Sequence, residues 1–122
     1  MSNLKKEVYY ESLSEAILSV EMHINHLKQI SSNTEIDESY KQKDLSKTKL
    51  NFELSLATLC ILLRKMKENS IIEYDDDIRK DINSIIHSSR FDYDQKVYAY
   101  SRNGKEALDL HAILNLAKKY AK

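Results

Sequence analysis

The sequence predicts an all-α fold, a compact helical bundle of about four helices, two of them long and two shorter. The 122 residues include no proline and a single glycine, whereas β-rich domains need turn residues at many positions. Apolar residues also recur at helical spacing along two long segments. The chain length suits a single helical domain, residues 1–122, with its own hydrophobic core.

The longest apolar run, LNFELSLATLCILLRKM, covers residues 50–66 and would form the centre of this bundle. On a helix it carries two neighbouring apolar rows, Phe52, Leu56, Leu59, Leu63 and Met66 in the first and Leu50, Leu54, Ala57 and Ile61 in the second. Two rows cover more than a third of the circumference, which predicts a helix buried among several neighbours. The only cysteine, Cys60, is expected to act there as a small hydrophobic residue.

A second interpretation of this run remains open, because residues 50–56 alternate strictly between apolar and polar side chains. The alternative fold is therefore α+β, with a small hairpin formed from the 50–56 and 91–100 stretches. A helix is favoured because the run continues through residues 57–67 without alternation, glycine or proline. The run is too short for a membrane span and contains Glu53, so no membrane association is expected.

Residues 3–31 predict a long first helix, since one apolar stripe keeps unbroken heptad spacing. The stripe consists of Tyr10, Leu13, Ile17, Val20, Ile24 and Leu27. We expect it to pack inside the bundle against residues 50–66, and a homodimer seam is the alternative. Several glutamates, Glu7, Glu11, Glu15 and Glu21, fall largely off the stripe and make one flank of this helix acidic.

The second half of the chain predicts two shorter helices. Asp75, Asp76 and Asp77 open the first of them, because carboxylates are favourable at the positive end of a helix dipole. Asn103-Gly104 is a turn signal that precedes the expected last helix, residues 105–121. The segment in between, 91–103, fits a strand, an aromatic loop or another helix.

Charge and composition exclude some classes of protein and favour others. The chain has 19 basic and 19 acidic residues, whereas general nucleic-acid binders usually carry a basic excess. A single cysteine and an N-terminus without an apolar leader favour a cytoplasmic protein. Heavy use of Lys, Asn, Ile, Ser and Tyr is typical of AT-rich genomes, which suggests a bacterial or phage source, such as a mobile element.

No pattern of residues predicts catalysis. His23 and His26 are three residues apart and share a helix face, but the other histidines, His87 and His111, belong to different segments. The chain contains no glycine-rich phosphate loop, no cysteine pair and no nucleophile elbow. We therefore expect no catalytic residue, no metal site, no cofactor and no enzymatic activity.

Two stretches are candidates for partner binding. The acidic candidates are Glu73, Asp75, Asp76, Asp77 and Asp81, which either serve the helix terminus or bind a basic protein. The aromatic and basic candidates are Arg90, Phe91, Tyr93, Tyr98, Tyr100 and Arg102. Tyrosine offers a large apolar body with a polar tip, so this stretch suits packing, a protein interface or stacking on single-stranded bases.

These observations predict a small cytoplasmic helical protein that acts by binding another protein. An inhibitor, an immunity or antitoxin-like protein, or an anti-defence protein of a bacterial mobile element would each fit. The alternative is a nucleic-acid-binding or assembly subunit of a nucleoprotein complex. Its contacts would come from the local basic patch of Lys41, Lys43, Lys47 and Lys49.

Overall fold

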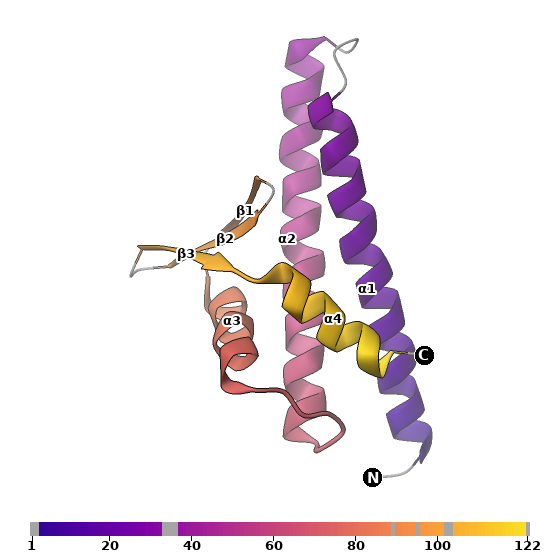
Figure 1. Ribbon diagram of the computed structural model, residues 1–122. Helices are drawn as coiled ribbons and strands as arrows, with labels where there is room; N and C mark the ends of the chain where they lie inside the picture. The colour runs from indigo at the N-terminus through magenta and orange to yellow at the C-terminus, as the bar shows by residue number, and fades with distance from the viewer. Residues whose placement is uncertain (1–2, 33–36, 89, 95, 102–103, 122) are drawn as a thin grey trace.

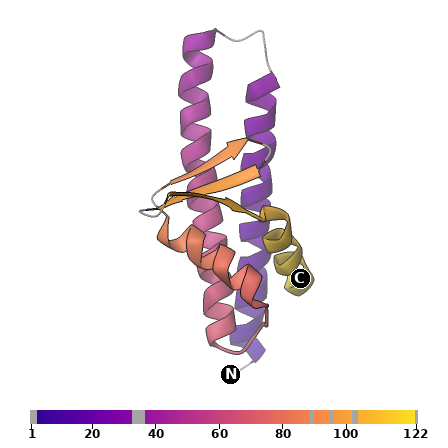
Figure 2. The same ribbon diagram turned by 60° about the vertical axis from the view of Figure 1, so that its left-hand side comes forward.

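The computed structural model describes residues 3–32, 37–88, 90–94, 96–101 and 104–121. The elements follow in the order α1 (Asn3–Ser32), α2 (Glu38–Glu68), α3 (Asp76–His87), β1 (Arg90–Asp94), β2 (Lys96–Ser101), β3 (Gly104–Leu108) and α4 (Leu110–Tyr120). The long helices α1 and α2 form an antiparallel hairpin, and α3, the sheet and α4 cover one side of it (Figures 1 and 2). The prediction of a bundle with two long and two shorter helices is confirmed.

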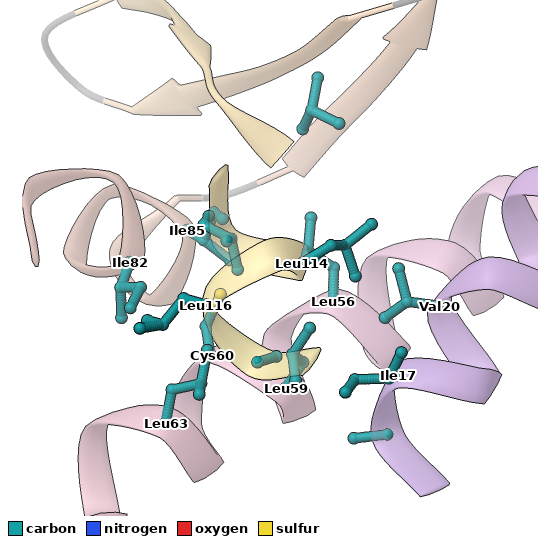
Figure 3. Packing of buried hydrophobic residues seen from close by; sticks show 14 of the residues in the cluster. Ile17, Val20, Leu56, Leu59, Cys60, Leu63, Ile82, Ile85, Leu114 and Leu116 are labelled. Carbon is teal, nitrogen blue, oxygen red and sulfur yellow. The ribbon is translucent and has the colours of Figure 1, made fainter. Parts of the chain in front are cut away.

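The apolar stripe of α1 packs against the first apolar row of α2, as expected. Ile17 and Val20 of α1 lie beside Leu56 and Leu59 of α2 in the core (Figure 3). The stripe residues from Leu13 to Leu27 are buried inside the molecule, so this face of α1 is not accessible to a second copy. Burying each such side chain stabilises the fold by roughly 1.5–3 kcal/mol.

The alternative hairpin that includes residues 50–56 is wrong, because this segment lies in the middle of α2. The expectation that the second row of α2 is buried is also wrong. Leu50, Leu54 and Ile61 are 54%, 60% and 44% exposed. The reason is that α3, the sheet and α4 all pack on the same side of the hairpin, which leaves the other side uncovered (Figures 1 and 2).

The segment that the sequence left open forms a three-stranded antiparallel sheet in the order β1-β2-β3. Val97 and Ala99 of β2 are buried, while Tyr98 and Tyr100 alternate with them and are only partly covered. Gly104 begins β3 with a φ of 111°, a conformation that only glycine adopts without strain.

The last helix is shorter than expected. It begins at Leu110 rather than at Lys105, because residues 104–108 pair with β2 as strand β3. Asp109 marks the boundary, where its side chain accepts a 2.9 Å hydrogen bond from the backbone N–H of Ala112. A carboxylate at this position satisfies an otherwise unpaired donor of the first helical turn.

Cys60 of α2 lies at the centre of the core, where it faces α3 and α4 (Figure 3). Its side chain is fully buried, and burial raises the pKa of the thiol far above its ordinary value. A neutral buried thiol is a poor nucleophile, so Cys60 contributes packing. No helix in the described part of the chain combines the length and hydrophobicity that a membrane span requires.

Candidate functional site

Two of the five acidic candidates stabilise α3, and a third, Glu73, contacts α4 through its backbone. Asp75 is the N-cap of α3 and accepts a 2.9 Å hydrogen bond from the backbone N–H of Ile78. Asp76 pairs with Arg79 one turn later, at 3.2 Å. Glu73 is exposed in the connection before α3, where its backbone N–H donates to the hydroxyl of Tyr120 at 3.4 Å.

The other two acidic candidates are joined by carboxylates from elsewhere in the chain. Asp81 of α3 accepts a 3.3 Å hydrogen bond from the backbone N–H of Asp109, which precedes α4. Glu106 of β3 accepts a 2.8 Å hydrogen bond from the hydroxyl of Ser84 on α3. We call Asp77, Asp81, Glu106 and Asp109 the acidic surface; no ion pair neutralises any of them within the described residues.

Burial and mutual repulsion affect the ionisation of this surface. Desolvation is the main cause that raises the pKa of Asp81, and the charges of Glu106, Asp109 and Asp77 raise it further. The hydrogen bond from the Asp109 backbone lowers the pKa of Asp81 but does not offset these effects. The negative charge of the acidic surface therefore destabilises the folded state.

We expect Asp81→Asn to stabilise the protein at neutral pH, because asparagine keeps the acceptor oxygen and removes the charge. At a pH below the ordinary carboxyl pKa of about 3.9, Asp81 is protonated in both the folded and the unfolded state, so its charge does not affect the free energy of unfolding. As the pH rises through the higher pKa of the folded state, ionisation destabilises the fold. Urea unfolding from pH 4 to pH 7 should show an advantage of the variant that grows with pH.

Asp76→Asn is the matched control for this measurement. Asp76 lies on the same helix, its side chain is 83% exposed, and its charge pairs favourably with Arg79. Removing that charge gives no stabilisation that grows with pH. An equal pH dependence of wild type and Asp81→Asn would contradict the electrostatic explanation.

The aromatic candidates divide between the strands of the sheet. Tyr98 and Tyr100 of β2 lie on the face opposite the buried Val97 and Ala99. The ammonium of Lys105 on β3 lies 4.1 Å from the ring centroid of Tyr98 and 5.9 Å from that of Tyr100, within cation–π range. We call Tyr98, Tyr100 and Lys105 the tyrosine face.

The remaining aromatic and basic candidates lie partly outside the described structure. The structure describes the backbone of Arg90, Phe91 and Tyr93 as part of β1 but not their side chains, and Arg102 lies outside the described residues. Arg90 is in register with Tyr100, and Tyr93 is in register with Val97. Pairing with β2 therefore brings the backbone of three candidates next to the tyrosine-bearing strand.

Strand β3 separates the acidic surface from the tyrosine face. Side chains alternate along a strand, so Glu106 projects to the side of α3, while Lys105 and Ala107 project to the opposite side. Residues Gly104–Ala107 are exposed, and no described strand pairs with the second edge of β3. Such an edge offers backbone donors and acceptors to another chain.

The four lysines of the local basic patch do not share one face of α2. Successive residues of a helix are about 100° apart, so Lys43 and Lys47 lie together on the outer side while Lys41 and Lys49 point elsewhere. Lys43 and Lys47 are exposed, and Lys41 and Lys49 are half-buried. The charge density expected from the sequence is therefore divided around the helix.

The histidines of α1 contact α2. His23 Nδ1 lies 3.2 Å from the hydroxyl of Ser55, and His26 Nε2 lies 3.7 Å from a carboxylate oxygen of Asp44. Across residues 3–121, apart from the short undescribed stretches, no three histidine, cysteine or acidic side chains are placed to hold a metal ion.

Comparison with protein-family models, curated proteins and solved structures finds no match to this chain. Sequence reasoning missed Lys105, Glu106 and Asp109, because it assigned residues 105–109 to the last helix. One available signal was Asp109 itself, an N-cap residue type directly before the apolar pattern of 110–117.

Proposed function

We propose that this protein acts by binding another protein, as inhibitors and antitoxin-like proteins do, and that strand β3 is the centre of the contact. The supporting observation is the exposed edge of β3, which lies between the acidic surface and the tyrosine face. An extended segment of the partner would add a strand to this edge through backbone hydrogen bonds. The flanking surfaces would then select its side chains.

The charges on both sides of β3 define the chemistry of that segment. The acidic surface carries four carboxylates, and desolvation together with the charges of Glu106, Asp109 and Asp77 raises the pKa of Asp81. Lysine or arginine side chains of a partner would remove this repulsion on binding. Tyr98 and Tyr100 offer large apolar surfaces with little conformational entropy to lose. The expected partner segment is therefore extended, basic and partly apolar.

Affinity capture from cells of the source organism tests the proposal with two matched variants. Asp77→Asn/Glu106→Gln removes two charges from the acidic surface, and Glu38→Gln/Glu68→Gln removes two charges from the ends of α2. The wild type and the α2 control should retain the same protein. The acidic-surface variant should bind the purified partner at least about 10-fold more weakly, because charge pairs at an interface lose affinity when one member is removed.

The salt dependence of binding and photo-crosslinking at β3 provide two further measurements. Raising the salt concentration from about 0.05 M to 0.5 M should weaken binding of the wild type more than binding of the acidic-surface variant. A photo-crosslinking residue in place of Ala107 should label the partner, and one in place of the exposed Asn115 on α4 should not. Capture of no specific protein, or equal affinity of both variants, would refute the proposal.

A further inference from the structure

The uncovered side of the α1–α2 hairpin carries exposed apolar side chains from both helices. Leu18 and Met22 of α1 are 62% and 66% exposed, and the second row of α2 contributes Leu50, Leu54 and Ile61. At about 100° per residue, both groups lie roughly opposite the buried stripes of their helices. Single exposed apolar residues are ordinary, but several on one side of one hairpin mark an interaction surface.

A groove runs along this side between the two helices. Its walls consist mostly of small side chains, and it is lined by Ala16, Ser19, His23, Asn51, Leu54, Ser55 and Thr58. Small residues let another helix approach the backbones closely, and Leu54 on the rim would cover an incoming helix. The uncovered side therefore has the shape and the hydrophobicity that helix packing needs.

The outer faces of the two helices carry opposite charges. Glu7, Glu11 and Glu15 are exposed on α1 and form no ion pair with any described residue. Near its C-terminal end α2 presents the exposed side chain of Lys65 on this side. Arg64 instead pairs with Glu68 on its own helix at 3.1 Å and lies toward Tyr74, on the covered side. The uncovered side is therefore acidic along the first part of α1 and basic near the end of α2.

The antiparallel hairpin also places the charged and apolar residues of α1 and α2 at matching positions along the helix axes. The groove residues rise along α1 and descend along α2, so Ser19 and Ser55 lie at about the same level. Counting eight residues along each helix from this level places Glu11 level with Leu63, two residues from Lys65. Counting in the same way places Leu18 level with residue 56, between Leu54 and Ile61 of the exposed row.

We propose that two copies of this chain form a dimer through the uncovered side, with a twofold axis parallel to the helices. This axis lays α1 of one copy on α2 of the other at equal height. Leu18 and Met22 then meet Leu54 and its neighbours of the second copy, and Glu11 and Glu15 approach Lys65 of the second copy. The surface is thus complementary to itself, as twofold symmetry requires.

The size of the uncovered side suits such a dimer. Helices of 30 and 31 residues are about 45 Å long, and two of them side by side are about 20 Å wide, or about 900 Å² in total. A standard interface buries about 800 Å² on each partner. The dimer leaves β3 accessible, because the sheet lies on the opposite side of the hairpin (Figures 1 and 2). Formation of the dimer does not depend on the partner protein proposed above.

Analytical ultracentrifugation of the purified full chain tests the dimer. The wild type should sediment with the mass of two chains at about 100 μM, and Leu54→Glu should raise the dissociation constant at least about 100-fold by burying an unpaired charge. The control is Asn115→Glu, at an exposed position on α4, which should dimerise like the wild type. A monomeric wild type, or a Leu54→Glu variant that dimerises normally, would overturn the proposal.

Charge reversal tests the pairing of α1 with α2 and does not depend on one substitution in the apolar row. Glu11→Lys and Lys65→Glu should each weaken the dimer about 10-fold, since each places like charges opposite one another. Combining both substitutions in one chain should restore the affinity to within about threefold of wild type. Circular dichroism verifies the folding of each variant. A combined variant as weak as its parents would overturn this arrangement.

Discussion

Leu59→Ala will lower the free energy of unfolding by about 3–5 kcal/mol, the range for truncating a large buried side chain in a packed core. Leu59 is completely buried on α2, where it packs with α1 in the central cluster (Figure 3). The loss includes the transfer of the removed atoms and the cavity that remains. Urea unfolding followed by circular dichroism measures it directly.

Leu54→Ala is the matched control for Leu59→Ala, because it makes the same chemical change on the same helix. Leu54 is 60% exposed, so its truncation should cost less than about 1 kcal/mol. The measurement is made at low protein concentration, so that dimerisation does not contribute to stability. Equal effects at the two positions would contradict the observed placement of the two apolar rows.

Val97→Asp will destabilise the protein by at least about 3 kcal/mol, since it buries a carboxylate in a hydrophobic core. Val97 is completely buried on β2 and belongs to the same core cluster as α2 and α4. The sheet is therefore docked on the helices and contributes to the single core. Thermal and urea unfolding of the variant measure this contribution.

The control for Val97→Asp is Ala107→Asp on the neighbouring strand. Ala107 is exposed and pairs in register with Tyr98, on the face of the sheet that points away from the core. An aspartate there has poor strand propensity but meets water, so the cost should stay below about 1 kcal/mol. A tolerated Val97→Asp would show that the sheet does not pack on the helices.

The Leu59 and Leu54 variants separate two side chains that look alike in the sequence. Leu54 and Leu59 lie in one apolar run, and the period of 3.6 residues shows only that they point in different directions. Which direction faces a neighbour depends on where α3, the sheet and α4 pack. The tertiary structure places all of them on one side, which buries Leu59 and exposes Leu54.

The sequence pattern did not predict the sheet, for a related reason. Val97 and Ala99 alternate with Tyr98 and Tyr100, but tyrosine counts as apolar, so the segment does not show a clear period of two. Strands also depend on partners that are distant in the sequence, whereas helical hydrogen bonds are local. Residues 104–108 become a strand because β2 is available to pair with them.

The candidate site shows the same division. The sequence identified Asp77 and Asp81 as charges near a helix terminus, and it identified Tyr98 and Tyr100 as aromatics suited to packing, a protein interface or base stacking. It did not bring Glu106 and Asp109 to Asp81, because those residues approach α3 only when β3 and α4 take their places. An electrostatic surface made from three elements cannot be inferred from spacing along one of them.

By itself, the amino-acid sequence determined the two long helices, the heptad contact between them, the helix opened by Asp75 and the core role of Cys60. These features follow from local periodicity, capping and composition, which act over a few residues. Only the tertiary structure decided which apolar row is buried, where the acidic surface forms and that the edge of β3 is exposed. Those features depend on which segments meet in space, and one-sided packing on the α1–α2 hairpin sets that outcome.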